Sequence, residues 1–170
     1  LAITDECSVA GMVRAHTEAK KLGLKLLPGA EFALADGCKL VVLAHNLTGW
    51  GNLCEFITRL RRASEKKGSY RLRQEELLGK ELENCVVVVC PARGSTAVQL
   101  RAIGRWSQQH FIDRCWLGVE QLRMIDDEIW LHKMRQASAA TAVPLVAVGG
   151  VYMHVRSRKP LQDVLTATRV

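Results

Sequence analysis

Carboxylates follow two apolar segments near the start of the chain. Leu1–Thr4 precedes Asp5 and Glu6, and Leu24–Pro28 is followed within three residues by Glu31. Strands of α/β proteins deliver functional side chains at their carboxyl ends, so these three residues are candidates for one site. Their oxygens are suitable ligands for a divalent cation. They are equally suited to cap helices or to pair with lysines, and the residues alone leave both interpretations open.

Other polar or reactive residues follow later apolar segments, namely His45, Cys90, Glu120 and the stretch from Gly149 to His154. We interpret His45 as a solvated loop residue at the same edge of the sheet. Cys90 would act as a nucleophile only beside a base that lowers its thiol pKa, and the sequence shows no such partner. The chain has no glycine-rich phosphate loop of the known types.

The segment 154–160 (HVRSRKP) is the densest basic patch that the sequence shows. Its charged residues, His154, Arg156, Arg158 and Lys159, are candidates for contact with DNA phosphates or with an acidic neighbouring domain. A solvated loop before a helix is the equally weighted alternative. The net charge of +7 and the pI of about 9.3 make acidic partners plausible without identifying one.

The elements that position these residues alternate between strands and helices. Cys85–Cys90 is almost all valine, which is typical of a parallel strand covered on both faces. About six strand–helix units follow one another, so we predict an α/β fold with a parallel sheet, either closed as a barrel or doubly wound. The predicted strands are 1–4, 24–28, 39–44, 85–90, 114–119 and 145–148.

Helix-period patterns occupy the intervals between these strands. The clearest, over 49–63, places Leu53, Phe56, Ile57 and Leu60 on one face. A second helix over 124–139 is expected to use Ile125, Ile129 and Met134 for its buried face. A final helix is expected from Pro160, in the first-turn position that proline favours, with Leu161, Val164 and Leu165 on one face.

Composition limits the class of protein. A length of 170 residues suits one domain, 1–170, with a substantial core. The six cysteines show no C-x-x-C pair, which favours reduced thiols in a cytoplasmic protein. No apolar run approaches a membrane span and no secretory signal is visible, so we expect no membrane partner. Because the chain starts without Met inside an apolar run, we expect an excised fragment.

Several segments, in order along the chain, resemble the PHP (polymerase and histidinol phosphatase) domain of bacterial error-prone DNA polymerases, of the DNA polymerase III alpha-subunit type. The most specific are AITDECS from Ala2 and HVRSRKPLQD from His154. Shorter matches are GLK from Gly23, GAEF from Gly29, GWGNLC from Gly49 and GSYRL from Gly68.

The resemblance implies a distorted (βα)7 TIM-like barrel at the N-terminus of a larger polymerase. It also implies that the first strand of the barrel, which carries a His-x-His metal motif, is missing from this chain. It implies a parent that uses Mg²⁺ in DNA replication and damage-induced translesion synthesis. The palm, fingers and thumb would follow Val170, so this fragment alone would not polymerise nucleotides. The implied partners are the polymerase core of the same chain, DNA, and other replication or mutagenesis proteins.

The resemblance also implies where metal ligands would stand. Active members have Thr-Asp-His where this chain has Thr4 to Glu6, a His where Lys39 stands, and Asp-x-His where Gly150 to Tyr152 stand; Glu31 keeps its ligand type. An ammonium has no lone pair and glycine has no side chain. We therefore expect an inactive site without metal, in which Lys39 pairs with the carboxylates. The vestigial positions are Asp5, Glu6, Glu31, Lys39, Gly150 and Tyr152.

Two other functions remain open at this point. One is a metal-dependent phosphoesterase or 3′-5′ exonuclease acting on DNA, with Asp5, Glu6 and Glu31 holding Mn²⁺, Mg²⁺ or Zn²⁺. The other is an unrelated α/β-barrel enzyme whose carboxylates serve a small-molecule substrate. The leading hypothesis is a structural and interaction module.

Overall fold

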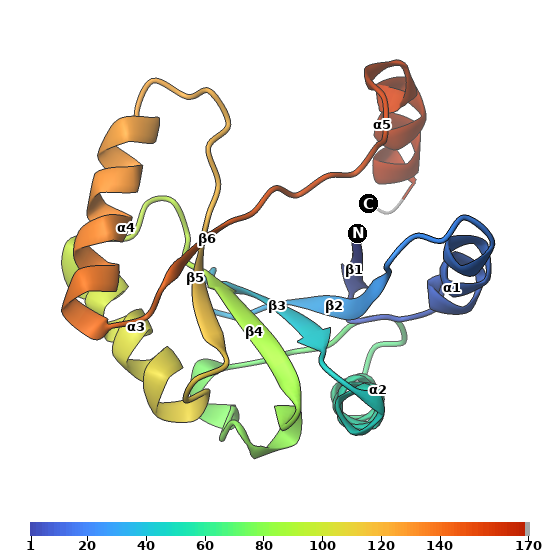
Figure 1. Ribbon diagram of the computed structural model, residues 1–170, viewed down its shortest axis with the longest axis horizontal. Coiled ribbons are helices and arrows are strands. Elements are labelled where there is room, and N and C mark those ends of the chain that lie inside the picture. Colours follow the sequence, from blue (N-terminus) through green and yellow to red (C-terminus); the bar gives the residue numbers. More distant parts are fainter. Residues whose placement is uncertain (169–170) are drawn as a thin grey trace.

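The computed structural model describes residues 1–168 as one curved sheet with helices around it (Figure 1). The six strands are β1 (Ala2–Glu6), β2 (Leu27–Ala33), β3 (Lys39–Ala44), β4 (Cys85–Cys90), β5 (Cys115–Val119) and β6 (Leu145–Ala147). The α-helices are α1 (Met12–Lys21), α2 (Leu47–Arg62), α3 (Ala97–His110), α4 (Asp127–Thr141) and α5 (Lys159–Ala167). The protein is therefore an α/β protein.

The strands lie side by side in chain order, with β1 and β6 as the edge strands of the described sheet. β1 pairs in parallel with β2, and β4, β5 and β6 are parallel to one another, but β3 runs antiparallel to both of its neighbours. The prediction of a wholly parallel sheet was therefore wrong at β3. Only residues 34–38 connect β2 to β3, which is too short for a crossover and long enough for a hairpin.

The reversal of β3 exchanges the edges of the sheet at which its two ends would lie if the strand were parallel to its neighbours. Lys39 begins the strand and pairs with Ala33 at the end of β2 and with Cys90 at the end of β4. His45 follows the other end of β3, where its N–H donates to the Asn84 carbonyl at 3.0 Å, just before β4 begins. Lys39 therefore lies at the carboxyl edge of the sheet, and His45 lies at the opposite edge.

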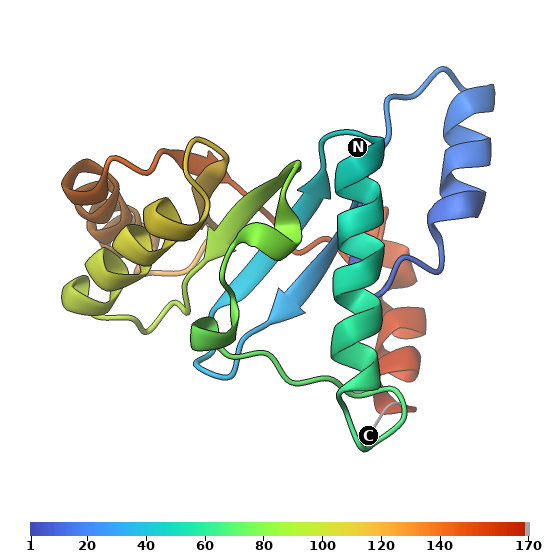
Figure 2. The same ribbon diagram turned by 90° about the horizontal axis from the view of Figure 1, so that it is seen from below.

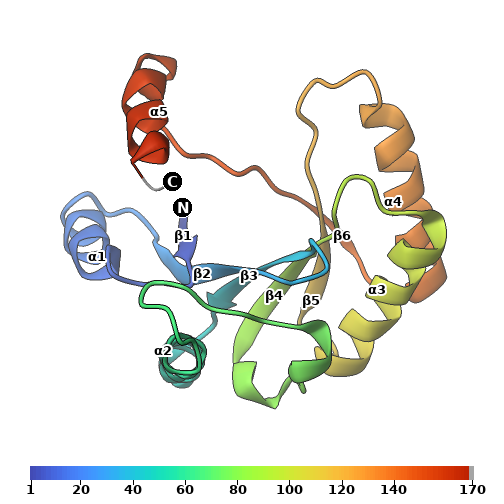
Figure 3. The same cartoon turned by 180° about the vertical axis from the view of Figure 1, so that it is seen from behind.

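The convex face of the sheet carries the core. Figures 1 and 3 show α2, α3 and α4 on this side, while α5 and the segment leading to it lie on the concave side. Phe32 of β2 meets Phe56 of α2 edge-to-face, with ring centroids 5.1 Å apart. Leu53, Phe56 and Leu60 are buried, as the helical pattern predicted. Burial of these apolar side chains fixes α2 across the sheet (Figure 2).

The buried face of α4 differs from the prediction. The helix begins at Asp127, and its buried apolar residues are Trp130, Met134 and Ala137. Ile125 is fully exposed and Ile129 is 62% exposed. Met134 is buried as predicted, and Trp130, one turn before it, shares its inward face. Ile125 lies before the first residue of the helix, and Ile129 lies on the side of the helix that faces solvent.

The last helix also departs from its pattern, because α5 buries no residue in the described structure. Leu161, Val164 and Leu165 are all about half exposed. Its proline stands in the first turn, as expected. Among the described residues, no helix combines the length and the apolar character that crossing a bilayer requires.

Candidate site at the carboxyl edge of the sheet

Strand register brings a small set of charged side chains to the carboxyl edge. Glu6 at the end of β1 is aligned with Glu31 of β2. Glu31 and Ala33 project from one face of β2 because side chains alternate along a strand, and Lys39 is the partner of Ala33. Glu31 and Lys39 therefore share the concave face, opposite to the face on which Phe32 packs.

Lys39 and Glu31 form an ion pair, with 3.5 Å between Nζ and Oε2. The expected pairing of Lys39 with the carboxylates is thus present for Glu31, whereas no ion pair joins Lys39 to Glu6 in the described part of the chain. Partial burial lowers the pKa of Lys39, but the charge and hydrogen bond of Glu31, with Tyr152 and Glu120 nearby, outweigh it and raise the pKa above the ordinary 10.5. Lys39 is accordingly a cation at neutral pH and has no lone pair to offer a metal.

Glu120 reaches the same edge from the end of β5. The N–H of Gly150 donates to its Oε1 at 3.0 Å. A Cβ on Gly150 would lie 3.5 Å from that oxygen and 3.7 Å from the ring of Tyr152, so the aromatic ring lies beside the contact. The backbone after β6 therefore occupies one carboxylate oxygen of Glu120.

Glu6 has a partner that the sequence did not suggest. The hydroxyl of Tyr70 donates to Glu6 Oε1 at 3.1 Å and accepts a hydrogen bond from the Ala33 N–H at 2.7 Å. Burial is the main cause that raises the pKa of Tyr70 to about 12, and the Glu6 carboxylate adds to the shift. The phenol remains protonated and bridges the ends of β1 and β2.

Arg61 of α2 holds the segment around Tyr70 in place. Its guanidinium donates to the carbonyls of Glu6 and Cys7 at 3.1 Å each and to the carbonyl of Gly68. It also lies over the Tyr70 ring, 5.3 Å from the centroid. A planar guanidinium with several donors suits this role, because it satisfies strand-end carbonyls that no further strand residue reaches.

Asp5 does not join the other carboxylates. It precedes Glu6 on the same strand, so the two side chains leave opposite faces of β1. A Cβ on Gly11, just before α1, would lie 3.5 Å from Asp5 Oδ2. Within residues 1–168, no three His, Cys, Asp or Glu side chains gather in an arrangement that could hold a metal ion.

The model of the PHP domain family matches residues 1–121 of this chain. The chain belongs to the PHP domain family. Error-prone DNA polymerases are similar along its whole length: that of Methylococcus capsulatus is 46% identical over 170 residues, and that of Dechloromonas aromatica is 42% identical over 174. In both cases the match covers 100% of this chain and 16% of the relative. The chain therefore spans about one sixth of the length of these relatives.

One solved structure has the same fold. It is a protein from Bifidobacterium adolescentis described as a metal-dependent phosphoesterase, with a TM-score of 0.57 and 13% identity, and the match covers 97% of this chain and 84% of that chain. At this identity the likeness establishes the α/β fold of the PHP domain and nothing about its site.

Cys90 of this PHP domain lies at the same edge as Lys39. Burial is the main cause that raises the pKa of its thiol to about 11; Lys39 opposes the shift, and the carboxylates of Glu120 and Glu31 reinforce it. The thiol is therefore protonated at neutral pH. A protonated, partly buried thiol is a poor nucleophile and a poor ligand.

The basic segment that the sequence singled out is exposed in the PHP domain. Arg156 and Arg158 belong to one 3-10 turn that leads into α5. Lys159 forms an ion pair with Asp163 on the next turn of α5, at 2.6 Å. His154, Arg156 and Arg158 form no ion pair with another described residue.

Sequence reasoning missed a second polar cluster beside the edge. Arg93, after β4, donates to Asp126 Oδ1 at 2.9 Å, to Asp127, and to the carbonyl of Glu120 at 3.3 Å. The hydrogen bond from Arg93 is the main cause that lowers the pKa of Asp126 below its ordinary value. No spacing in the sequence indicates this pairing, because 33 residues separate Arg93 from Asp126.

Proposed function

We propose that this PHP domain belongs to an error-prone DNA polymerase and serves there as a structural module rather than as a metal-dependent hydrolase. The similarity to error-prone polymerases along the whole chain supports the first part. One observation carries the second part: each carboxylate that reaches the concave edge is already bound to a donor of the protein itself.

The donor set does not fit a catalytic metal centre. Lys39 binds Glu31, Tyr70 binds Glu6, and the N–H of Gly150 binds Glu120. A hydrolytic metal needs several lone pairs that converge on one point, together with a position for water. Here an ammonium stands among the carboxylates, where it repels a cation and supplies the positive charge itself.

The same contacts give the edge a structural role. Lys39 links β3 to β2, Tyr70 links the segment after α2 to the ends of β1 and β2, and Gly150 links the chain after β6 to β5. Charged and polar contacts of this kind fix the positions of loops where a metal cluster would otherwise do so. The module then presents a rigid surface to its neighbours.

The proposed neighbours follow from the size of the relatives. They are about six times as long as this chain, so the domain would pack against a polymerase core of the same polypeptide. The basic segment with His154, Arg156, Arg158 and Lys159 is proposed as one contact with that core or with DNA. Other replication or mutagenesis proteins, a role in translesion DNA synthesis and repair, and a place in the cytoplasm belong to the same proposal.

The test uses the complete polypeptide that carries this domain. Primer extension with Mg²⁺ tests the polymerase assignment. Calorimetric titration with Mn²⁺, Mg²⁺ and Zn²⁺, and 3′-5′ degradation of single-stranded DNA, test the metal site. We expect primer extension, and we expect any nuclease activity to be unchanged in Glu31→Ala.

The alternatives have distinct signatures in these assays. Binding of two or more cations that is lost in Glu31→Ala, with loss of DNA degradation, would establish the exonuclease or phosphoesterase function instead. Absence of primer extension with a normally folded protein would refute the polymerase assignment, whatever the metal titration shows.

A further inference from the structure

Positive charge is concentrated in a second region, away from the segment 154–160. The stretch 59–73 contains seven basic residues and one acidic residue, Glu65, in a chain whose total net charge is +7. It begins in the last turn of α2 and continues through the connection that follows this helix. Its basic residues are Arg59, Arg61, Arg62, Lys66, Lys67, Arg71 and Arg73.

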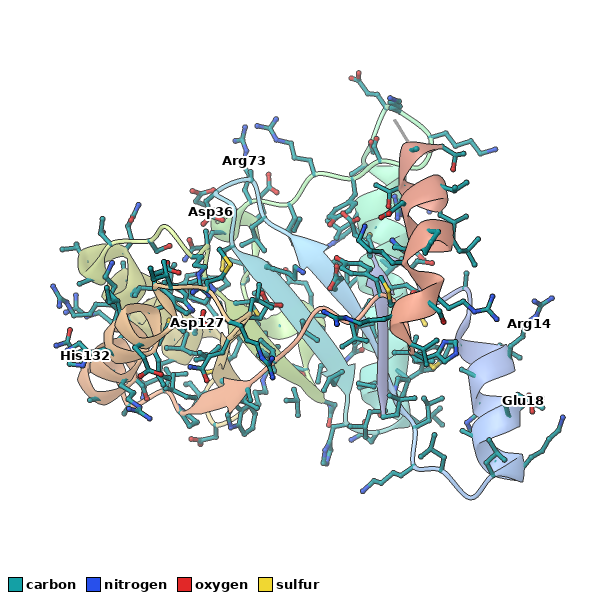
Figure 4. The ribbon with its side chains drawn as sticks, turned by 90° about the horizontal axis from the view of Figure 1, so that it is seen from above. Arg14, Glu18, Asp36, Arg73, Asp127 and His132 are labelled. Carbon is teal, nitrogen blue, oxygen red and sulfur yellow. The ribbon has the colours of Figure 1, made fainter. Side chains whose placement is uncertain are left out.

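Three of these side chains have neighbours that use or offset their charge. Arg59 forms an ion pair with Glu81 at 3.4 Å, and Arg61 is committed to backbone carbonyls. Arg73 lines a hollow together with Asp36, Glu75 and Glu76. Figure 4 shows Arg73 near Asp36 at the upper margin of the molecule.

Four basic residues remain. Arg62, Lys66, Lys67 and Arg71 are exposed, and none forms an ion pair with another residue of the described part of the chain. We call these four residues the basic loop. Glu65 is the one carboxylate within it, so the loop carries an excess of positive charge that the fold leaves unneutralised.

The backbone under the basic loop is fixed by the fold. Arg61 binds the Gly68 carbonyl, and the Ser69 hydroxyl donates to the Lys66 carbonyl at 2.6 Å. Leu72 is buried, and its carbonyl accepts from the Ala35 N–H at 2.9 Å. Ordering of this backbone therefore does not subtract from the free energy of ligand binding.

We propose that the basic loop binds the phosphate backbone of a nucleic acid without reading its sequence. Exposed, unpaired lysines and arginines are the groups that contact phosphates. Protein interfaces instead depend on buried aromatic or aliphatic anchors, and no large apolar side chain is exposed between Leu47 and Leu78. The choice of DNA as the probe rests on the proposed function, whereas the assignment of the basic loop as a phosphate-binding surface rests on its charge and exposure alone.

The experiment measures fluorescence anisotropy of a labelled 25-nucleotide single strand and of the matching duplex, over a series of salt concentrations. The test variant combines Lys66→Ala, Lys67→Ala and Arg71→Ala. The control variant removes the same charge from α3 and α4 with Arg101→Ala, Arg105→Ala and Arg135→Ala. Both are made in the complete polypeptide and in the 170-residue chain, and circular dichroism checks that each is folded.

We expect the test variant to lose at least about fivefold in affinity at low salt, because three phosphate contacts disappear. The slope of log K against log salt should fall by about 2 for single-stranded DNA. The control should change affinity less than about twofold. Equal losses in both variants, or no binding by the wild type, would overturn the proposal.

A further arm separates nucleic acid from an acidic protein partner. Polyglutamate competes with DNA at equal charge concentration. Competition as strong as that of unlabelled DNA would reject phosphate recognition in favour of an acidic polypeptide. Because DNA binding is also measured with the 170-residue chain, its result does not depend on primer extension. Absence of primer extension would refute the polymerase assignment, and absence of DNA binding would refute the proposal for the basic loop.

Discussion

Replacing Lys39 by methionine tests whether its ammonium compensates the carboxylates at the edge of the sheet. The substitution keeps the length of the side chain and removes its charge. Glu31, whose side chain is only 20% exposed, then loses the cation that lies 3.5 Å from its Oε2. Loss of charge compensation, rather than loss of packing, is therefore the main consequence that we expect.

The size of the effect follows from distance and burial. At 3.5 Å and an effective dielectric constant of about 20, the attraction between unit charges is about 5 kcal/mol before any cost is subtracted. Desolvation of both groups offsets most of it, and water screens Lys39, whose side chain is 36% exposed. We expect Lys39→Met to lower the free energy of unfolding by about 1 to 3 kcal/mol.

A double-mutant cycle isolates the pair. Urea unfolding of Lys39→Met, Glu31→Gln and the double variant should give a coupling energy of about 1 kcal/mol. The matched control is Lys21→Met with Glu18→Gln, a pair that is closer, at 2.8 Å, but whose side chains are 64% and 63% exposed. Its coupling should stay below about 0.5 kcal/mol.

The pH dependence of the cycle has a defined direction. Because the folded protein raises the pKa of Lys39, the stabilisation is complete below pH 10.5 and disappears as the pH rises through the higher folded value. A coupling for Lys39 and Glu31 no larger than that of the exposed control, or one that does not weaken at high pH, would refute the reasoning.

Three further predictions concern other residues of the fold. Gly79→Ala should lower the free energy of unfolding by more than about 2 kcal/mol, because its φ of +81° disfavours a side chain and a Cβ would lie 2.1 Å from the His110 carbonyl oxygen. Gly68→Ala is the matched control: its φ is +83° but a Cβ would lie in open space, so urea unfolding should show a loss of about 1 kcal/mol. Because folding raises the pKa of Tyr70 from 10.0 to about 12, the wild type should lose stability as the pH rises through this range. Tyr70→Phe should abolish that loss, as circular dichroism during unfolding would show. Arg93→Ala should lower the melting temperature at neutral pH, because Asp126 loses its hydrogen-bond donor. The difference in melting temperature between variant and wild type should shrink below pH 3.8, because Asp126 is protonated as the pH falls through its lowered pKa and the wild type then loses the same contribution.

Much of the fold was predictable because burial imposes local periodicity. The valine run of β4 and the stripe of Leu53, Phe56 and Leu60 on α2 both occupy the places that the sequence indicated. The prediction failed where apolar residues had a choice of partners. Met134 is buried as predicted, but Ile125 and Ile129, which fit the same helical period, are exposed, and Trp130 and Ala137 are buried in their place where α4 packs on α3.

The direction of β3 decided the composition of the site. The alternation of side chains is the same in both directions along a strand, so it does not reveal which way β3 runs. It therefore could not show which end of β3, Lys39 or His45, lies at the carboxyl edge of the sheet. The resemblance of the motifs to the PHP family placed Lys39 in the site, and the hairpin between β2 and β3 gives the physical reason.

The sequence by itself determined the class of fold, the family and the residue types at the edge, because these depend on composition, spacing and motif. Only the tertiary structure decided which donor meets which carboxylate. Tyr70 meets Glu6 across 64 residues of chain, and Gly150 meets Glu120 across 30. Such pairs depend on the register between strands and on the path of connecting segments, and these are properties of the packed molecule rather than of any local stretch of sequence.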